Sequence, residues 1–272
     1  MDSEATTLGL DPASLAALLD HIATCSPAVP INRDTGRRTA ALVPVFVFGF
    51  PVDMAPLLTL ASEWNLTVVE GAAESLGSTY HDLNCASFGR LATLSFSGNN
   101  IIATRGGGAI GTDDAALARR AKLLSATAKG PHRWDFFRNE TVYNYRLPNL
   151  NAALGVAQFE QLPQPLAAKR RLAERYAGSL AGFERAQILQ EAESARSNQW
   201  LNALLINHDW VYRRHEVLSA PNDAGLMTRL IWTLMHCLPR CQARPRADLS
   251  VAEDLAARVL NLPSSANLVG KS

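Results

Sequence analysis

A near-continuous apolar run, AALVPVFVFG at residues 40–49, constrains the fold more than any other feature of the chain. Its β-branched and aromatic residues predict a strand buried on both faces, as in the interior of a parallel sheet. Asp53 then stands where it would cap a helix over 54–64, and LTVVE at 66–70 predicts the next strand. Strand, helix and strand in this order predict a right-handed crossover, and therefore an α/β fold with a mostly parallel sheet.

The same patterns extend along the rest of the chain. The second half differs from the first in its expected structure: a long loop rich in aromatic and basic residues comes first, and a smaller α+β unit follows. We therefore predict a partial large domain over residues 1–162, followed by a bridging helix and a small C-terminal domain over 163–272. The further expected elements are a helix over 13–22 capped by Asp11, strands over 90–96 and 107–112, a helix opened by Asp113 over 114–124, helices from about Leu147 and over 165–180, a strand over 200–207 and a helix over 251–260.

Composition excludes several classes of function. A net charge of +1 and a sequence pI of about 7.7 give no reason to expect nucleic acid or an acidic membrane as a partner. The apolar run is too short to span a bilayer, and the first residues, MDSEATTLGLD, do not form a secretion signal. We expect a cytoplasmic chain without a metal site, although HCLPRC at 236–241 places a histidine near two cysteines. The four widely scattered cysteines are Cys25, Cys85, Cys237 and Cys241.

The stretch LSFSGNNIIATRGGGAI, residues 94–110, suits the binding of a phosphate. A hydroxyl at Ser95 and a glycine run ending at Gly108 allow an anionic group to approach the backbone closely. A cofactor phosphate normally serves a reactive group nearby, yet the neighbouring positions are Asn99 and Asn100. The sequence thus predicts a phosphate site beside residues that lack the expected chemistry.

Three motifs in order, VVEGAAESLGSTY (68–80), the 94–110 stretch and YNYRLPNLNAALGVAQFEQLP (143–163), resemble those of the DegT/StrS-type sugar aminotransferases. These are fold-type I enzymes that use pyridoxal phosphate (PLP), and the resemblance is greatest to the branch that acts on nucleotide-linked amino sugars toward legionaminic-acid-like sugars. It continues to NLPSS at 261–265. It implies a fold-type I large domain, transfer of an amino group from glutamate to a keto sugar, and a homodimer.

The resemblance also implies roles for individual residues. Ser95 would hydrogen-bond the PLP phosphate, Ala73 would lie against one face of the pyridine ring, and Glu74 would sit near the ring's 3-hydroxyl. Asn144 and Arg146 would reach the phosphate in the neighbouring subunit.

Two departures from the family pattern remove the chemistry. The Schiff-base lysine position holds Asn100, and an amide forms no imine with PLP and carries no proton at neutral pH. The position of the aspartate that pairs with the pyridinium nitrogen holds Gly71, while Glu70 is expected on the other side of its strand. We therefore expect a catalytically inactive homologue that at most binds a nucleotide sugar or pairs with an intact paralogue.

The alternative is an active transaminase that uses another lysine or is completed by a partner chain. Lys122 and Lys169 are expected on solvated helix faces, whereas Lys129, in the aromatic loop, stays open as a substitute; the remaining lysine is Lys271. A Rossmann dinucleotide site is a weaker alternative, because the glycine run lacks the strand–GxGxxG–helix context.

Backbone conformation gives two more expectations. Arg105 and Val142 stand where the family has glycine, so either would be strained if its φ is positive. The chain resembles the family from its middle onward, which predicts a truncated large domain whose sheet keeps an exposed edge.

Overall fold

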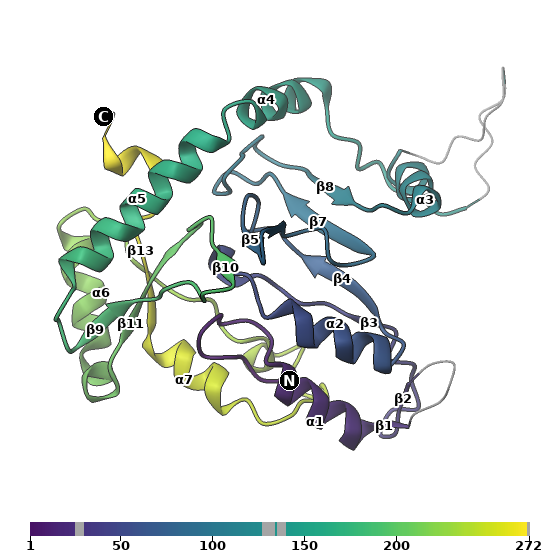
Figure 1. The fold of residues 1–272 in the computed structure, drawn as a ribbon, viewed down its shortest axis with the longest axis horizontal. Coiled ribbons are helices and arrows are strands. Elements are labelled where there is room, and N and C mark those ends of the chain that lie inside the picture. The colour runs from purple at the N-terminus through teal and green to yellow at the C-terminus, as the bar shows by residue number, and fades with distance from the viewer. Residues whose placement is uncertain (25–29, 127–133, 135–139, 271–272) are drawn as a thin grey trace.

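A computed structural model describes residues 1–24, 30–126, 134 and 140–270. Its main sheet has the strand order β3-β4-β7-β8, with β3 at Ala41–Leu42, β4 at Thr67–Gly71, β7 at Leu91–Ser95 and β8 at Gly108–Gly111 (Figure 1). The β3–β4 and β4–β7 pairings are parallel and the β7–β8 pairing is antiparallel. The predicted α/β class with a mostly parallel sheet is confirmed.

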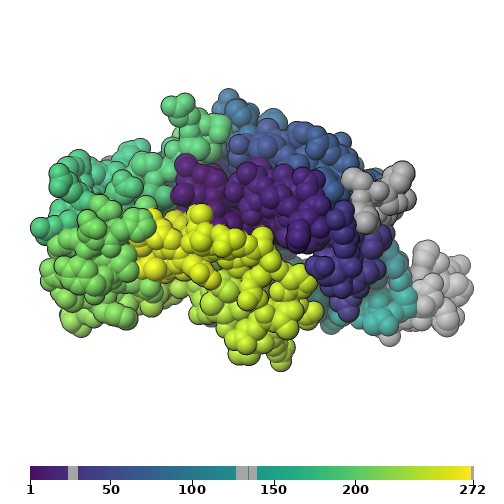
Figure 2. All heavy atoms as spheres, turned by 90° about the horizontal axis from the view of Figure 1, so that it is seen from below, coloured from purple at the N-terminus to yellow at the C-terminus, as the bar shows by residue number. Residues whose placement is uncertain are grey.

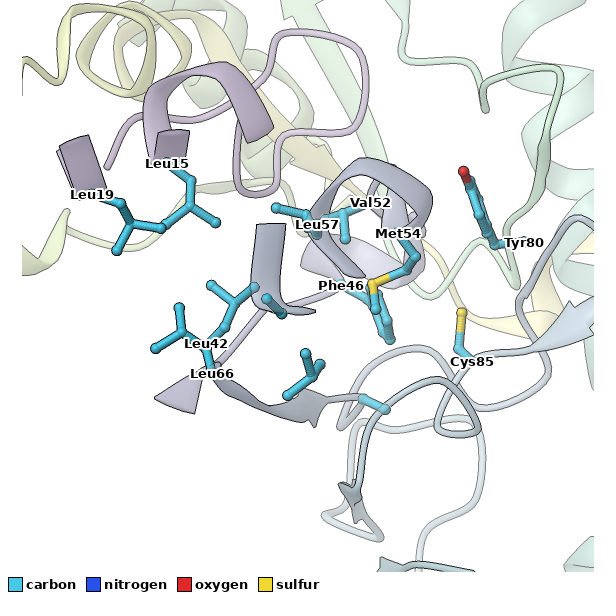
Figure 3. Close-up of a cluster of buried hydrophobic side chains, with 13 residues drawn as sticks. Leu15, Leu19, Leu42, Phe46, Val52, Met54, Leu57, Leu66, Tyr80 and Cys85 are labelled. Atoms are coloured by element: carbon cyan, nitrogen blue, oxygen red, sulfur yellow. The ribbon is translucent and has the colours of Figure 1, made fainter. Parts of the chain in front are cut away.

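Two helices cover one side of this sheet. In α1 (Pro12–Ile22) the Asp11 carboxylate accepts from the amides of Ala13 and Ser14, as predicted for a cap. Leucines of α1 and of α2 (Met54–Glu63) pack with Leu42, Phe46 and Val68 in one buried cluster (Figure 3). Burial of such side chains supplies about 1.5–3 kcal/mol each, so this cluster stabilises the strand–helix–strand unit.

The expectation for the apolar run at 40–49 is wrong in its extent. The strand ends at Leu42, and the following Val43 and Val45 are 55% and 46% exposed. A 3₁₀ turn then begins at Val47, where Phe48 has a φ of 58°. The reason is position, because β3 is an edge strand of the described sheet and Pro44 has no amide hydrogen to donate.

Two predicted helix caps also differ from the structure. The Asp53 carboxylate makes no cap bond to α2; instead it accepts from the Tyr80 hydroxyl at 2.6 Å. Asp114, and not Asp113, caps α3 (Ala115–Ser125) by accepting from the amides of Ala116 and Leu117. The Asp53 carboxylate thus follows a donor from a distant segment, whereas the helix cap at Asp114 lies one residue after the predicted one.

The second half contains an antiparallel sheet of order β12-β13-β11-β9. The predicted helices from about Leu147 and over 165–180 and the predicted strand over 200–207 overlap observed elements. The predicted helix over 251–260 is wrong at residues 259–260, which form a strand, and the division into two domains stays a prediction. The bounds are α4 Asn149–Phe159, α5 Pro163–Ser179, β9 Ala186–Ile188, β11 Asn202–Ile206, α6 Arg214–Asp223, β12 Arg229–Leu230, α7 Ser250–Arg258 and β13 Val259–Leu262. Short two-residue strands are β1 Ala23–Thr24, β2 Ile31–Asn32, β5 Thr79–Tyr80, β6 Leu83–Asn84 and β10 Ala195–Arg196.

The first residues pack against the last helix. The Asp2 carboxylate accepts from the amides of Val251 and Ala252, both at 2.9 Å, at the start of α7. Figure 2 shows the N-terminal residues lying against the C-terminal part of the chain. Asp2 therefore supplies from a distance the cap that Leu249, the residue before α7, lacks. Within the described part of the chain, the helices are all too short or too polar to cross a membrane.

Candidate functional site

The predicted site residues converge at the carboxyl ends of β4 and β7. These strands are parallel neighbours with Gly71 opposite Thr93, so the segments that follow them start side by side. Ala73 and Glu74 follow β4, and Ser95 ends β7. In parallel sheets the crevice beyond the carboxyl ends is the usual place for a ligand. The structure therefore brings these three predicted residues to one edge of the sheet.

The turn after β7 is closed by Asn100. Its side-chain amide donates to the carbonyl oxygen of Ser95 at 2.9 Å, and its backbone amide donates to that of Ser97 at 3.0 Å. The Ser95 hydroxyl, half-buried, donates to the Ser97 hydroxyl at 3.1 Å. The Asn100 side chain is thus hydrogen-bonded to the end of the strand that precedes it, and it presents an amide at the position that the sequence predicts to correspond to the Schiff-base lysine.

The backbone at residues 105–107 has positive φ angles, which favour glycine. Arg105 has a φ of 62° and Gly107 a φ of 89°. A Cβ at Gly108 would stand 2.2 Å from the carbonyl oxygen of Leu94, so only glycine fits against β7 there. The expected strain at Arg105 is confirmed, at a typical cost of about 1–2 kcal/mol for a residue with a Cβ. Val142, by contrast, does not have a positive φ.

Glu74 links the site to the segment that contains Phe48. Its carboxylate accepts from the Phe48 amide at 2.8 Å. Burial raises the pKa of the Glu74 carboxyl to about 7, although the hydrogen bond from Phe48 acts in the opposite direction. This group therefore changes charge near neutral pH, a property common among groups at functional sites.

Asn198 joins the second half of the chain to the same turn. Its side-chain amide donates to the carbonyl oxygens of Glu74 and Leu76 at 2.8 and 2.9 Å, and its side-chain oxygen accepts from the Trp200 amide at 2.8 Å. The residue is 1% exposed. Sequence reasoning missed it; the polar group SNQ at 197–199, directly before the predicted strand over 200–207, was the available signal.

Glu70 and Gly71, at the end of β4, have different surroundings. Glu70 is completely buried and accepts from the amides of Ala86, Phe88 and Gly89, each at 2.7 Å, so it is structural. A Cβ at Gly71 would stand 3.0 Å from Cγ2 of Val45 and 3.2 Å from the carbonyl oxygen of Pro44. No carboxylate points from position 71, and restoring one requires Val45 to shift.

Asn144 and Arg146 are more exposed to solvent than Ala73, Glu74 and Ser95. Both side chains are exposed, on a segment that runs beside the end of α3, where Asn144 forms a bridge with Ala126. Leu147, directly after them, contacts the glycine run, since a Cβ at Gly107 would lie 2.4 Å from its Cδ1. The role of Asn144 and Arg146 toward a phosphate stays a prediction.

The expectation for Lys169 is wrong. This side chain is buried, and its amine donates to the carbonyl oxygens of Trp200 and Ser264 at 3.0 and 2.5 Å. Desolvation lowers the pKa of the Lys169 amine to about 8. Helix α5 thus places Lys169 against the chain just before β11 and just after β13, a contact that helical periodicity alone did not reveal. Lys122 is exposed, as predicted, while Lys129 and Lys271 lie outside the described residues.

A metal site has no support among residues 1–24, 30–126, 134 and 140–270, where no three His, Cys, Asp or Glu side chains gather. His236 of HCLPRC instead contacts the Glu253 carboxylate through Nε2 at 3.0 Å.

The site fits one end of PLP and not the other. Ser95 and the glycine run provide a hydroxyl and a tightly turned backbone for a phosphate. At the reactive end, position 100 holds a bound amide and position 71 holds no side chain. The residues present therefore suit phosphate binding but not imine formation.

Comparison with known proteins gives a consistent result. Residues 11–272 match the DegT/DnrJ/EryC1/StrS aminotransferase family. A GDP-perosamine synthase from Caulobacter vibrioides is 34% identical over 269 residues, which are 98% of this chain and 68% of the relative. The structure of the Helicobacter pylori aminotransferase PseC, which is involved in pseudoaminic acid biosynthesis, superposes on this chain with a TM-score of 0.87 at 21% sequence identity. The superposition covers 98% of this chain and 68% of the PseC chain. A sugar aminotransferase from Streptococcus pneumoniae, solved in its PLP form, superposes with a TM-score of 0.82 at 19% sequence identity. This superposition covers 97% of this chain and 69% of the Streptococcus chain.

Proposed function

We propose a function for this chain from the premise that it belongs to the DegT/DnrJ/EryC1/StrS aminotransferase family. The family is PLP-dependent, its fold is that of the fold-type I aminotransferases, and the homologues of this chain are nucleotide-sugar aminotransferases. This chain spans about two thirds of the length of the relatives that it matches. On that basis, the chain is a homologue that binds a nucleotide-linked sugar and is catalytically inactive as a transaminase.

One observation carries the proposal. The Asn100 amide is hydrogen-bonded to the Ser95 carbonyl at the position of the Schiff-base lysine. An amide nitrogen is not a nucleophile toward an aldehyde and holds no proton that it could move to or from a substrate carbon. Gly71 removes the second requirement, because no carboxylate is left to keep a pyridine nitrogen protonated.

PLP, when bound, would supply the electron sink for amino transfer. Ser95 would donate to its phosphate, Ala73 would contact the ring, and Glu74 would face the 3-hydroxyl. Because Asn100 and Gly71 do not fit the reactive end, we derive no step through PLP. Binding of PLP to this chain would be non-covalent and weaker than in an intact relative.

A second candidate, an active transaminase with another lysine, has one observation in its favour. The buried Lys169 amine, with a pKa of about 8, is partly neutral at physiological pH, as imine formation requires. However, the amine already donates to the backbone carbonyls of Trp200 and Ser264, and no contact of Lys169 with Ser95 or the glycine run is observed among the described residues, so it is the weaker candidate. Completion by a partner chain, with Asn144 and Arg146 reaching a neighbouring phosphate, belongs to the same alternative.

Three further points belong to this proposal. The chain would act in the cytoplasm, where nucleotide sugars are made, and it would form a homodimer or pair with an intact paralogue. The sugar would be an amino sugar of surface polysaccharide or nonulosonate biosynthesis. The large domain would cover residues 1–162 and the small one 163–272.

Borohydride reduction in the presence of PLP tests the proposal. After reduction, peptide mass mapping should find no pyridoxyl group on any lysine, and incubation with glutamate should produce no pyridoxamine phosphate. An intact family transaminase serves as the positive control. A pyridoxyl group on Lys169 or Lys129 that disappears when that lysine is replaced by arginine, together with turnover, would establish the second candidate instead.

A further inference from the structure

One face of the main sheet is exposed to solvent. A row of paired residues crosses all four strands of the sheet, from Val45 through Gly71 and Thr93 to Ile110. Paired residues on neighbouring strands point to the same side of a sheet, so this row marks one face. Val45 and Ile110 are 46% and 56% exposed, and Thr93 in the middle of the row is exposed as well. The face is therefore open at both edges and at its centre.

The opposite face of the same sheet is well covered. Leu42 and Val68 form a cross-strand pair on that side and are 3% and 7% exposed, in one cluster with leucines of α1 and α2. Along residues 41–46, exposed and buried side chains alternate strictly. A mostly parallel sheet is normally covered on both faces. The exposed face is thus a surface that still lacks its cover.

The exposed face carries no charge. Glu70 is the one charged residue among residues 41–45, 67–71, 91–95 and 108–111, and it is completely buried on the opposite side, where it is paired with Ala92. Strands lie about 4.8 Å apart and rise about 3.3 Å per residue, so four strands of about five residues present a face of about 300 Å². An apolar patch of this size on a protein surface is often an interaction site. By the alternation of side chains, the face presents Ala41, Val43, Val45, Thr67, Val69, Leu91, Thr93 and Ile110.

The chemistry of this face suits a second copy of the same chain. Because the face is uncharged, it meets an identical face without any contact between like charges. A two-fold axis brings the same patch of both copies together and closes the contact, so that association stops at the dimer. Sheets that pack face to face lie about 10 Å apart, with the side chains of the two inner faces interdigitating.

We propose that two copies of this chain associate face to face through the exposed side of the main sheet, with Val43, Val45 and Ile110 in the contact. The inference rests on the proposed function for the pairing itself and deepens it, because it names the surface through which the chain pairs. A face of about 300 Å² is less than half of the area of about 800 Å² that each partner buries in a standard interface, so the dimer is weak and concentration-dependent.

Sedimentation equilibrium of the full chain, without PLP or a sugar, tests the proposal over a wide range of protein concentration. Val43→Lys and Ile110→Lys should each weaken dimerisation at least about 10-fold, because the dimer contains each change twice and would have to desolvate both ammonium groups. Val43→Ile should retain the association. The two lysine substitutions lie toward opposite edges of the sheet, so an edge-to-edge contact through β8 would respond to Ile110→Lys alone.

Leu150→Lys is the matched control, because Leu150 is an equally apolar side chain, 83% exposed, on α4 outside the four strands. It should leave the association unchanged, and each lysine variant should unfold near the temperature of the parent chain, since the replaced side chains are exposed.

Three results would overturn the proposal. The first is a chain that is monomeric at every concentration, and the second is a dimer that dissociates on Leu150→Lys, or on Ile110→Lys but not Val43→Lys. The third is a face that binds an intact relative, such as the Caulobacter GDP-perosamine synthase, instead of a second copy and releases it on Val43→Lys. A monomer without a pyridoxyl-lysine would overturn only this inference, whereas a dimer that depends on Val43 and shows transaminase turnover would overturn only the proposed inactivity.

Discussion

Replacing Asn198 by alanine should lower the free energy of unfolding, because Asn198 connects the turn after β4 to the chain before β11. Its side chain makes three hydrogen bonds, to Glu74, Leu76 and Trp200, within 2.8–2.9 Å, and it is 1% exposed. A buried polar group left without its partner costs about 1–3 kcal/mol, so the alanine variant should lose about 3–5 kcal/mol of the free energy of unfolding. Domains are stable by only about 5–15 kcal/mol, so this is a large fraction of the total.

Urea unfolding at pH 7, followed by circular dichroism, measures this loss. Asn198→Asp keeps the size of the side chain but places a carboxylate beside two carbonyl oxygens, and it should be at least as destabilising as alanine. Gln164→Ala, an exposed amide on α5, is the control and should change the free energy by no more than about 0.5 kcal/mol. A loss below about 1 kcal/mol for Asn198→Ala would show that these hydrogen bonds do not hold the turn to β11.

Four further predictions follow from the site and the sheet. Asn100→Lys combined with Gly71→Asp should still give no transamination of a nucleotide-linked keto sugar with glutamate, because the rest of the cofactor environment is not restored; measurable turnover would refute this. Because burial raises the pKa of Glu74 to about 7, above its unfolded-state value, wild-type stability falls as pH rises from about 4.5 to 7. Glu74→Gln should therefore be more stable than wild type by about 2–3 kcal/mol at pH 8 and equal to it near pH 4, as measured by urea unfolding at both pH values. Arg105→Gly should raise the free energy of unfolding by about 1 kcal/mol, whereas the same change at a helical arginine should lower it. Ile110, 56% exposed on the edge strand β8, should drive self-association, so Ile110→Lys should shift size-exclusion chromatography toward smaller species.

Local chemistry was enough to predict much of this structure. The β4 and β7 strands and the Asp11 cap depend on residue type and immediate neighbours, and both predictions are confirmed. Strain at Arg105 was expected only on the condition of a positive φ, and the folded chain meets that condition. The convergence of Ala73 and Glu74 with Ser95 followed from the parallel pairing of their strands.

Contacts between distant segments account for the errors. Lys169 has the sequence context of a solvated helix residue, and it is buried only because Trp200 and Ser264 offer carbonyl oxygens to it. Asp53 likewise binds Tyr80, which no local pattern indicates. The stack of Trp232 on Phe48 and Trp200 joins residues that are well separated in the chain, so it was visible only in the folded protein.

The bond from Asp2 to α7 has a consequence for the order of folding. The residues that it joins, Asp2 and Val251, are separated by almost the entire chain. During synthesis Asp2 leaves the ribosome well before Val251, so its carboxylate stays in water until α7 has been made. Closure of such a long loop is an entropically late event, so the final helix should dock after the parallel sheet has formed. A nascent chain stalled before residue 250 would then lack these two amides and leave the segment around Asp2 undocked, and synthesis of α7 would dock it.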